Sequence, residues 1–314
     1  MAKKGSLKSA LSSQQGRLKK KQEAQQAAQV AEQRGTKTPL AKDAKGKAKV
    51  TAGPVTVPFK PTDKILLVGE GNFSFARALV CEPPPALEFL PGSSVVATAY
   101  DTEAECFEKY PEAKAFVEEI RAKGAEVFFG VDATKLEKVP SLRNRQFDKI
   151  VWNFPHAGKG IADQDRNILS NQVILLGFLR SSAHLLKKGP KPSLTSRKKK
   201  RSDDSDREDV NSEDEGQSSG SADSRGTILV TLRNVPPYTL WDLPRLAKNP
   251  PPPQSQADPV NPSYVQHRSF VFHRSLWKGY QHKMTKGERA HGTGTTGQGG
   301  EDRTWEFYIN NKVH

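Results

Sequence analysis

The pattern of apolar and polar positions from Asp63 onward alternates between short apolar runs and longer stretches with helical spacing. Continuously apolar runs indicate buried strands. These runs are Lys64–Val68, Ser94–Tyr100, Glu126–Gly130, Phe147–Asn153 and Thr227–Leu232. The stretches between them predict helices over Phe73–Val80, Thr102–Lys123 and Asp165–Lys187. Strands that alternate with helices are typical of an α/β fold, in which a parallel sheet is covered on both faces.

The C-terminal part departs from this alternation. We expect a short helix over Trp241–Ala247 and then a proline-rich break at Pro250–Pro253. Two further strands are predicted over Tyr264–Phe272 and Thr304–Ile309, with a Gly/Thr loop at Gly292–Gly300 between them. Such a looped return favours an antiparallel pair. The pattern therefore predicts a mostly parallel seven-stranded sheet with an antiparallel C-terminal strand pair.

Two segments lack an apolar pattern. Residues 1–60 are rich in Lys, Gln, Ala and Ser, although Leu18–Arg34 could form a transient helix. Residues 190–225 form a basic run followed by an acidic, serine-rich run. Both segments are too poor in apolar residues to fold, so we expect them to be disordered. We interpret 190–225 as an insertion at a surface turn, which interrupts one folded domain at 61–314.

The charge of the chain is uneven. The 314 residues carry a formal net charge of +14, and residues 1–50 hold 13 Lys and Arg against 3 Asp and Glu. A basic arm on a more balanced body is typical of proteins that act on nucleic acid, and it should add salt-dependent affinity for RNA. A solubilising tail is the alternative. Arg197–Arg201 could be a nuclear import signal or simply part of a charged loop.

Several protein classes are disfavoured by what the chain lacks. Cys81 and Cys106 are the only cysteines, and they form neither a metal-binding pattern nor a disulfide framework. No apolar run approaches the roughly 20 residues that a bilayer span needs. The lysine-rich N-terminus is not followed by the apolar segment of a secretory signal. We therefore expect a soluble intracellular protein with no metal site and no membrane partner.

The loop after the first predicted strand, GEGNFS, is the first candidate ligand site. Parallel sheets bind ligands outside the carboxyl ends of their strands, and the first strand-to-helix turn is the usual place. Gly69 permits a tight turn and Gly71 lets a ligand approach the backbone. Ser74 replaces the third glycine of a dinucleotide motif, and Glu70 would repel a pyrophosphate. The loop therefore favours S-adenosylmethionine over a nicotinamide dinucleotide, which leaves a nicotinamide-dependent oxidoreductase as a disfavoured alternative.

Two acidic residues follow the next strands. Asp101 ends the second strand, where a carboxylate can accept hydrogen bonds from both ribose hydroxyls of a nucleoside. Asp132 follows the third strand and could bond the amino group of an adenine. A helix N-cap is the structural alternative for each residue, and Asp101 could also be simply solvated.

The fourth strand ends in Asn153-Phe154-Pro155-His156. This turn partly matches the Asp/Asn-Pro-Pro-aromatic tetrad of methyltransferases that modify nucleobase nitrogens, where the tip of the strand holds the nitrogen in line with the methyl donor. His156 is a candidate base or orienting group, because an imidazole titrates near ~6.5; it could also only shape the turn. Phe154 or Trp152 could stack on the base, and Trp152 could instead face the core.

Taken together, ILLVGEGNFSFARAL, ATAYD, FDKIVWNFPHAGKG and GYQHKMT resemble the eukaryotic large-subunit ribosomal RNA uridine-N3 methyltransferase family. The resemblance covers roughly residues 62–189 and 226–310, and the insertion departs from it only in length. It implies a Rossmann-like class I methyltransferase fold, S-adenosylmethionine as cofactor, and methylation of a uridine N3 in large-subunit rRNA. It also implies action in the nucleolus, on rRNA or pre-ribosomal particles.

By motif position, the resemblance places Asp101 at the ribose and Asn153, Pro155 and His156 at the methyl-transfer centre. The residues that it places beside the methionine part are Gly69, Glu70, Gly71, Asn72, Phe73 and Ser74. A non-catalytic nucleolar RNA-binding or ribosome-assembly protein on the same fold is the alternative. The intact glycine loop and Asp101 argue against it.

Basic and aromatic residues near the C-terminus are candidate RNA contacts, because such mixtures bind both phosphates and bases. The strongest candidates are Tyr280, His282 and Lys283. Arg268, His273, Arg274, Trp277 and Lys278 extend this predicted patch.

Overall fold

The computed structural model describes residues 15, 16, 19, 55–158, 160–161, 163–192, 224–253, 259–283 and 300–310. The expected features of the remaining residues lie outside these ranges. They include most of the basic arm with its Leu18–Arg34 helix, the centre of the insertion with Arg197–Arg201, and nearly all of the Gly/Thr loop.

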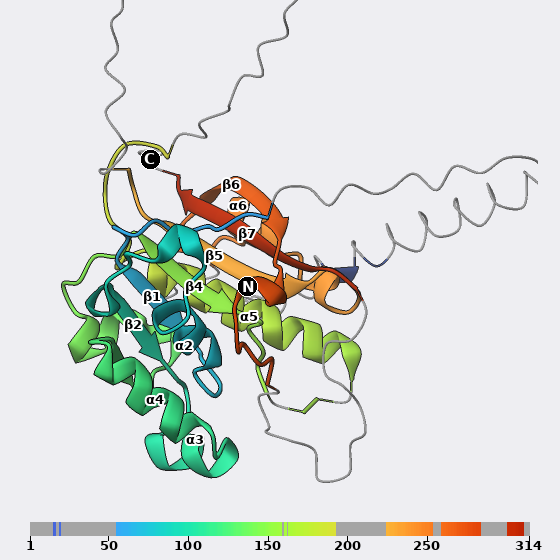
Figure 1. The fold of residues 1–314 in the computed structure, drawn as a ribbon. Helices are drawn as coiled ribbons and strands as arrows, with labels where there is room; N and C mark the ends of the chain where they lie inside the picture. Colours follow the sequence, from blue (N-terminus) through green and yellow to red (C-terminus); the bar gives the residue numbers. More distant parts are fainter. Residues whose placement is uncertain are drawn as a thin grey trace, which may run out of the picture.

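Seven strands form one sheet in the order β3-β2-β1-β4-β5-β7-β6 (Figure 1). The strands are β1 (Ile65–Val68), β2 (Val95–Thr98), β3 (Glu126–Phe128), β4 (Lys149–Asn153), β5 (Thr227–Arg233), β6 (Tyr264–Val271) and β7 (Asp302–Ile309). The first five pair in parallel, whereas β7 is antiparallel to both of its neighbours, β5 and β6. The predicted fold class, a mostly parallel seven-stranded α/β sheet with an antiparallel C-terminal pair, is confirmed.

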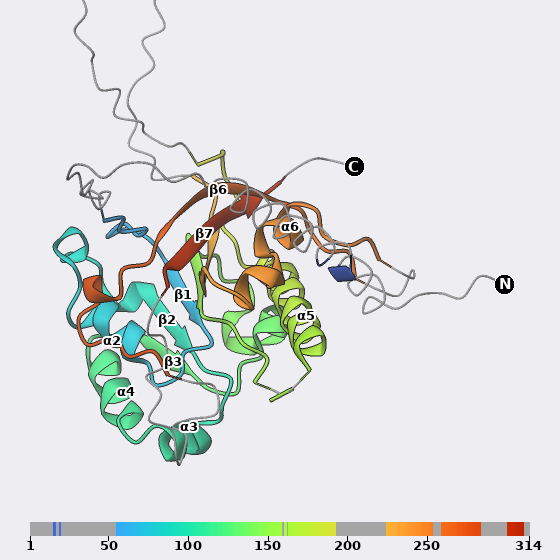
Figure 2. The same cartoon turned by 90° about the vertical axis from the view of Figure 1, so that its right-hand side faces the viewer.

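Helices cover both faces of the sheet. The α-helices are α2 (Ser74–Val80), α3 (Glu103–Lys109), α4 (Ala113–Ala122), α5 (Gln164–Ser182) and α6 (Leu243–Lys248). The 3₁₀ helices are η1 (Pro85–Leu87), η2 (Gly92–Ser94), η3 (Ala133–Lys138), η4 (Pro140–Leu142), η5 (Tyr238–Trp241) and η6 (Arg274–Leu276). In Figure 2, α2 and α4 lie on one side of the sheet, and α5 and α6 lie on the other. Among the described helices, none is long and apolar enough to cross a membrane.

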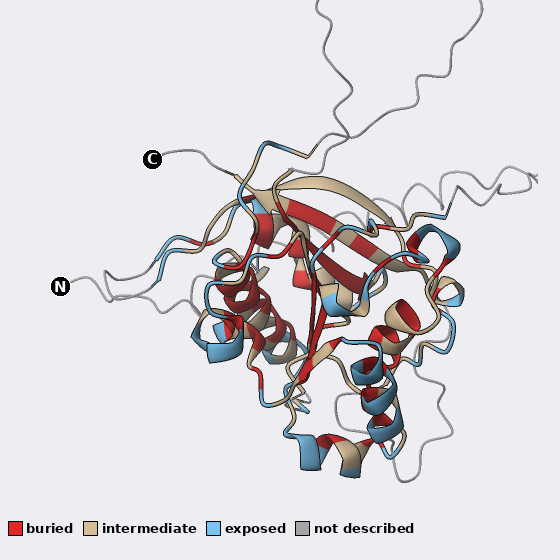
Figure 3. Ribbon diagram, turned by 60° about the vertical axis from the view of Figure 1, so that its left-hand side comes forward, coloured by how far each residue is buried: buried red, intermediate tan, exposed pale blue. Residues whose placement is uncertain are grey.

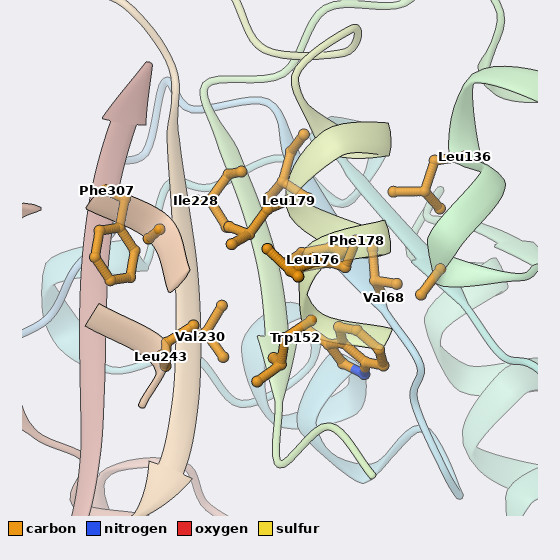
Figure 4. Packing of buried hydrophobic residues seen from close by; sticks show 14 of the residues in the cluster. Val68, Leu136, Trp152, Leu176, Phe178, Leu179, Ile228, Val230, Leu243 and Phe307 are labelled. Carbon is orange, nitrogen blue, oxygen red and sulfur yellow. The ribbon is translucent and has the colours of Figure 1, made fainter. Parts of the chain in front are cut away.

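Alternate side chains of β1 build two separate cores, because successive residues of a strand point to opposite faces. Ile65 and Leu67 pack toward α2 and α4, whereas Leu66 and Val68 pack toward α5. Figure 3 shows the resulting burial, with buried residues along the central strands and exposed residues on the outer sides of the helices. Figure 4 shows the core on the α5 side. This two-sided burial explains why the strand sequences are continuously apolar.

The single helix predicted over Thr102–Lys123 is wrong, because the chain forms two helices there. Helix α3 ends at Lys109 and α4 begins at Ala113. Pro111 explains the break, since a proline disfavours helical dihedrals in the residue before it. Tyr110 accordingly has φ −134° and ψ 88°. The segment after β2 therefore contains two short helices in place of one long helix.

The helix predicted over Asp165–Lys187 ends earlier, at Ser182. The residues beyond it return to the sheet instead, and the Phe147 amide donates to the Leu185 carbonyl at 2.8 Å. Farther along, the Arg225 amide donates to the Pro190 carbonyl at 2.9 Å. The chain therefore leaves and re-enters the fold at one place, which supports the reading of the intervening segment as an insertion at a turn.

Candidate active site

A cavity of about 800 Å³ lies at the carboxyl ends of the parallel strands. Its walls come from the loop after β1, the ends of β2 and β3, the turn after β4, and the segment Tyr280–Lys283. Ligand pockets commonly have volumes of about 300–1,000 Å³, so the cavity is large enough for a cofactor together with part of a substrate. Within the described ranges, no three His, Cys, Asp or Glu side chains group as metal ligands.

The two glycines of the loop have different structural roles. Gly69 has φ +67°, and a Cβ there would lie only 2.5 Å from the Trp152 Nε1 atom. This position therefore needs glycine for both its backbone conformation and its space. A Cβ on Gly71 would meet the Lys283 Cβ at 3.6 Å, an ordinary contact distance. Gly71 therefore has room for a Cβ, and it lines the cavity.

Glu70 lines the cavity, but its carboxylate turns back onto the first turn of α2. The Ala76 amide donates to Glu70 Oε2 at 3.2 Å, and the Ser74 amide donates to Asn72 Oδ1 at 3.2 Å. Burial raises the pKa of Glu70 to about 7, while hydrogen bonds from the amides of Ala76 and Phe75 act in the opposite direction. Because the side chains of Asn72 and Glu70 accept from the amides of Ser74 and Ala76, these amides are not free to bind a phosphate. This geometry agrees with the preference for a ligand without a pyrophosphate.

Ser74 ties the loop to a segment far along the chain. Its hydroxyl donates to the Gln281 carbonyl at 3.1 Å and accepts from the Gln281 amide at 3.0 Å. The Asn72 amide group donates to Gln281 Oε1 at 3.1 Å and to Glu112 Oε1 at 2.8 Å. Lys283 Nζ also lies 2.8 Å from Glu112 Oε1. Sequence reasoning placed Gln281 only in the predicted RNA-binding patch and did not single out Glu112. It missed the contacts of both with the loop, because nothing local marks a contact between residues 207 or 40 positions apart.

The three strongest RNA-contact candidates, Tyr280, His282 and Lys283, all lie in the cavity wall. Tyr280 is deeply enclosed, and burial raises the pKa of its hydroxyl. Burial, followed by the positive charges of Arg274 and Arg233, lowers the pKa of His282 to about 4, so this imidazole is neutral near pH 7. Their contact with RNA stays a prediction.

The wider predicted patch does not form a simple exposed basic face. Three of its cations have carboxylate partners and one aromatic is buried. The cation pairs are Arg268 with Glu306, Arg274 with Asp302 and Lys278 with Glu82, and Trp277 is the buried aromatic. Much of this positive charge is therefore used to hold β6, β7 and the α2 region together.

The two acidic residues occupy the side of the cavity formed by β2 and β3. Asp101 is not a helix cap, because Thr102 caps α3; its Oδ2 atom lies 2.6 Å from Lys109 Nζ. Asp132 is the N-cap of η3 and accepts from the Thr134 amide at 2.9 Å. Burial acts to raise the pKa of Asp132, but bonds from Thr134 and Lys135 lower it below its usual value. Both carboxylates line the cavity.

The turn after β4 places Asn153 at the floor of the site. Its Oδ1 atom accepts from the Thr231 hydroxyl at 2.8 Å, and the Thr231 and Thr304 hydroxyls lie 2.9 Å apart. The Nδ2 atom of Asn153 is buried, and no described residue accepts its hydrogen bond. Phe154 follows with φ 53°, and Pro155 is buried behind it. Asn153 therefore lines the cavity, but its unpaired Nδ2 atom is enclosed by protein and is not open to it.

His156 is held as a neutral imidazole. The Gly158 amide donates to His156 Nδ1 at 2.9 Å, so the proton of the neutral ring is on Nε2. Burial lowers the pKa of His156, which keeps the ring neutral near pH 7. The ring of Trp241 packs 5.9 Å from it between centroids. This geometry fits a hydrogen-bond donor better than a general base, because Nδ1 is already an acceptor and Nε2 already carries a proton.

The aromatic residues near the turn have protein partners. Trp152 is 8% exposed and packs edge-on against Phe178, with ring centroids 4.8 Å apart (Figure 4). It therefore belongs mainly to the core, as the alternative reading of this residue expected. Phe154 packs against His282 at 4.5 Å between centroids, and Arg274 lies over its ring at 5.2 Å.

Comparison with known proteins identifies similar chains. Residues 66–284 match the family described as "BMT5-like: rRNA (uridine-N3-)-methyltransferase BTM5-like". The "25S rRNA (uridine(2634)-N(3))-methyltransferase" of Saccharomyces cerevisiae is 27% identical over 280 residues, which cover 82% of this chain and 74% of that protein. "Heavy metal-associated isoprenylated plant protein 41" of Arabidopsis thaliana is 30% identical over 232 residues, covering 74% and 35%. "Ferredoxin-fold anticodon-binding domain-containing protein 1 homolog" of Mus musculus is 36% identical over 132 residues, covering 42% and 19%.

Proposed function

Because the chain belongs to the BMT5-like rRNA (uridine-N3-)-methyltransferase family, we propose that it transfers a methyl group from S-adenosylmethionine to N3 of a uridine in large-subunit rRNA. The family match confirms the resemblance expected from the sequence, and the chain is a methyltransferase of rRNA bases. The finer parts of the proposal are the cofactor, the large-subunit target and the action on pre-ribosomal particles in the nucleolus of the nucleus.

One structural observation carries the proposal. A single cavity at the carboxyl edge of the sheet is lined both by the loop Gly69–Ser74 and by the turn Asn153–His156. Methyl transfer requires the donor and the acceptor to meet in one enclosed space. A cofactor bound by the loop would share this space with a base that enters at the turn.

The residues of the cavity fit S-adenosylmethionine. When bound, this cofactor supplies an electrophilic methyl group on a sulfonium. Asp101 and Asp132 line the side of the cavity where a nucleoside would lie, each paired with a lysine, and Gly71 leaves room beside the backbone. We propose that the loop Gly69–Ser74 holds the methionine part, Asp101 the ribose hydroxyls and Asp132 the adenine.

The turn after β4 would hold the target base. N3 of uridine lies on the Watson–Crick edge, so the nucleotide must be unpaired or flipped out of a duplex to enter the cavity. We propose that Asn153, Pro155 and His156 orient N3 toward the methyl donor, since positioning can supply much of the reduction in the barrier. His156 acts here as an orienting donor, so the N3 proton that the methyl group replaces would leave to solvent and not to this imidazole. Tyr280, His282 and Lys283 would contact the RNA strand beside the flipped base.

The proposal also includes roles for the basic arm and the insertion, which lie largely outside the described ranges. We propose that the chain comprises a disordered basic arm, placed at 1–60 from the sequence, and a methyltransferase domain at 61–314 that is interrupted by the insertion at 190–225. The end of this arm already belongs to the fold, because Phe59 is buried and packs against Trp277. The arm would bind RNA phosphates through its excess of lysine, and Arg197–Arg201 would direct nuclear import.

Two measurements test the proposed function on the full chain. Calorimetric titration should show S-adenosylmethionine binding at one site. Incubation with that cofactor and with rRNA from cells that lack the protein should add one N3-methyluridine, mapped by mass spectrometry. Cofactor binding without rRNA methylation would instead favour the ribosome-assembly role, and no cofactor binding would reject the cofactor assignment.

A variant at the turn tests the assigned roles. His156→Ala should lower methylation more than it lowers cofactor affinity, because His156 is placed beside the base. Full methylation by this variant would remove His156 from the mechanism.

A further inference from the structure

We propose that Glu112 is a positioning residue for the cofactor. It would act through Asn72 and Lys283 to hold the loop Gly69–Ser74 in the conformation that binds S-adenosylmethionine. Glu112 lies outside the set of described residues that line the cavity, so it would act without touching the ligand. The inference rests on the proposed function, because it concerns the cofactor loop of the same site. It assigns a role to a residue that no sequence motif marks.

The loop contains a backbone conformation that needs support from its surroundings. Phe73 has φ 61° and ψ 16°, in the left-handed region that residues with a side chain rarely adopt. Such a conformation persists only where neighbouring contacts hold it in place. The Phe73 ring is fully buried and packs edge-on against Phe129, with ring centroids 5.3 Å apart. This packing holds one side of the loop and leaves its polar side to be held by hydrogen bonds.

The side chain of Asn72 makes the hydrogen bonds on this polar side. It is 2% exposed, and its Oδ1 atom accepts from the Ser74 amide at 3.2 Å, across Phe73. Its Nδ2 atom donates to Glu112 Oε1 at 2.8 Å and to Gln281 Oε1 at 3.1 Å. An asparagine amide group offers two N–H donors, so both are satisfied here. Removal of either acceptor would leave a buried donor unpaired unless the loop moves.

Glu112 joins the loop to two other parts of the chain. It is the N-cap residue of α4, but its side chain makes no capping hydrogen bond to that helix. The same Oε1 atom that accepts from Asn72 lies 2.8 Å from Lys283 Nζ. Burial acts to raise the pKa of Glu112, whereas bonds from Lys283 and Asn72 lower it below its usual value. One carboxylate oxygen therefore connects the loop, the start of α4 and the segment Tyr280–Lys283.

A loop held in this way is organised before the cofactor binds. If the network is cut, the cofactor must order the loop itself, and its apparent affinity falls with the fraction of protein in the competent state. Methyl transfer from the bound cofactor should change far less, because saturating cofactor restores the loop. A purely structural role of Glu112 would differ, since general destabilisation reduces the amount of active enzyme. That loss lowers kcat and leaves the KM for the cofactor unchanged.

The test uses the full-length chain with S-adenosylmethionine as the probe. Glu112→Ala removes the shared oxygen, whereas Glu112→Gln keeps an Oε1 acceptor and removes only the charge. Gln281→Met removes the second acceptor of Asn72 without a large change in volume. Glu118→Ala makes the same truncation at an exposed position of α4 and serves as the control. Calorimetry measures the dissociation constant, rRNA methylation gives kcat and the KM for the cofactor, and urea unfolding checks that each variant is folded.

We expect Glu112→Ala to weaken cofactor binding by about 10- to 100-fold, the effect of losing a hydrogen bond to a charged group. The KM for the cofactor should rise by a similar factor, with kcat at saturating cofactor within about threefold of the wild type. Glu112→Gln should recover most of the lost affinity, because the oxygen shared by Asn72 and Lys283 remains. Gln281→Met should weaken binding by about 2- to 10-fold, the effect of one neutral hydrogen bond. Glu118→Ala should change neither binding nor methylation.

The outcomes distinguish this inference from the proposed function. If the wild type binds no S-adenosylmethionine, the cofactor assignment fails and the inference fails with it. If the wild type binds the cofactor but Glu112→Ala binds it equally well, or loses kcat with an unchanged KM, only the inference is overturned. A Glu112→Ala variant that does not fold would make the role structural and would overturn it too. Weak binding by folded Glu112→Ala that Glu112→Gln restores would support the inference, even if the wild type methylated no rRNA.

Discussion

Replacing Gly69 by alanine should weaken the fold through two effects that the structure separates. Gly69 has φ +67°, a conformation that costs an L-residue about 1–2 kcal/mol. The new Cβ would also lie 2.5 Å from Trp152 Nε1, so the indole or the loop must shift. Trp152 packs against Phe178, and overpacking of a filled core costs about 1–3 kcal/mol. Gly69→Ala should therefore lower the free energy of unfolding by about 2–5 kcal/mol.

Urea unfolding followed by circular dichroism measures this loss, which should shift the midpoint by about 1 M. Gly71→Ala is the matched control, because its Cβ would meet nothing closer than 3.6 Å. Its free energy of unfolding should stay within about 1 kcal/mol of the wild type. Because Gly71 faces the cavity, this control should nevertheless bind S-adenosylmethionine more weakly.

Equal stability of Gly69→Ala and the wild type would refute the steric reasoning, because neither the dihedral cost nor the contact with Trp152 could then be real. Unfolding of Gly71→Ala at low urea would show that the loop tolerates no side chain at either glycine. In that event, the distinct roles assigned to the two positions would be wrong.

Two further predictions concern buried carboxylates. Burial opposes ionisation of Glu306, but Lys149 at 2.6 Å and Arg268 lower its pKa to about 2, so its stabilisation is present above pH 4.5 and is lost as the pH falls toward 2. Glu306→Gln should lower the free energy of unfolding at pH 7 by about 3–5 kcal/mol. It should also flatten the dependence of that free energy on pH between 4.5 and 2. Urea titrations at several pH values measure both effects, and an unchanged pH dependence would contradict the pairing. Burial raises the pKa of Glu70 from 4.5 to about 7, so the protein is stabilised below pH 4.5 and loses that contribution as the pH rises through 7. Glu70→Gln keeps an acceptor for the Ala76 amide. In the same assay at pH 8, this variant should be more stable than the wild type by up to about 3 kcal/mol. A variant less stable than the wild type would show that the charge of Glu70 itself is needed.

Most of the fold could be predicted from local pattern. Buried strands such as Ile65–Val68 have continuously apolar sequences because both faces of the sheet are covered. The main error was the single helix predicted over Thr102–Lys123. The apolar spacing favours one continuous helix, but Pro111 interrupts it. That residue was visible in the sequence, and its effect on Tyr110 is local.

The candidate site was predictable only in its residue types. The sequence by itself determined that glycines follow β1, that Asp101 follows β2, and that His156 comes shortly after Asn153 at the end of β4. These features depend on neighbours along the chain, and the parallel arrangement brings them to one edge. The preference against a pyrophosphate also followed from the sequence, through Glu70.

Only the tertiary structure decided what these side chains do. Thr231 directs the Asn153 amide across 78 residues, and Gln281 binds Ser74 across 207. Lys109, the last residue of α3, pairs with Asp101 at the cavity. Periodicity reports which face of an element is buried, but hydrogen-bond partners depend on strand order and register, which bring distant segments together. The direction of an amide and the tautomer of an imidazole are therefore properties of the assembled sheet and its turns.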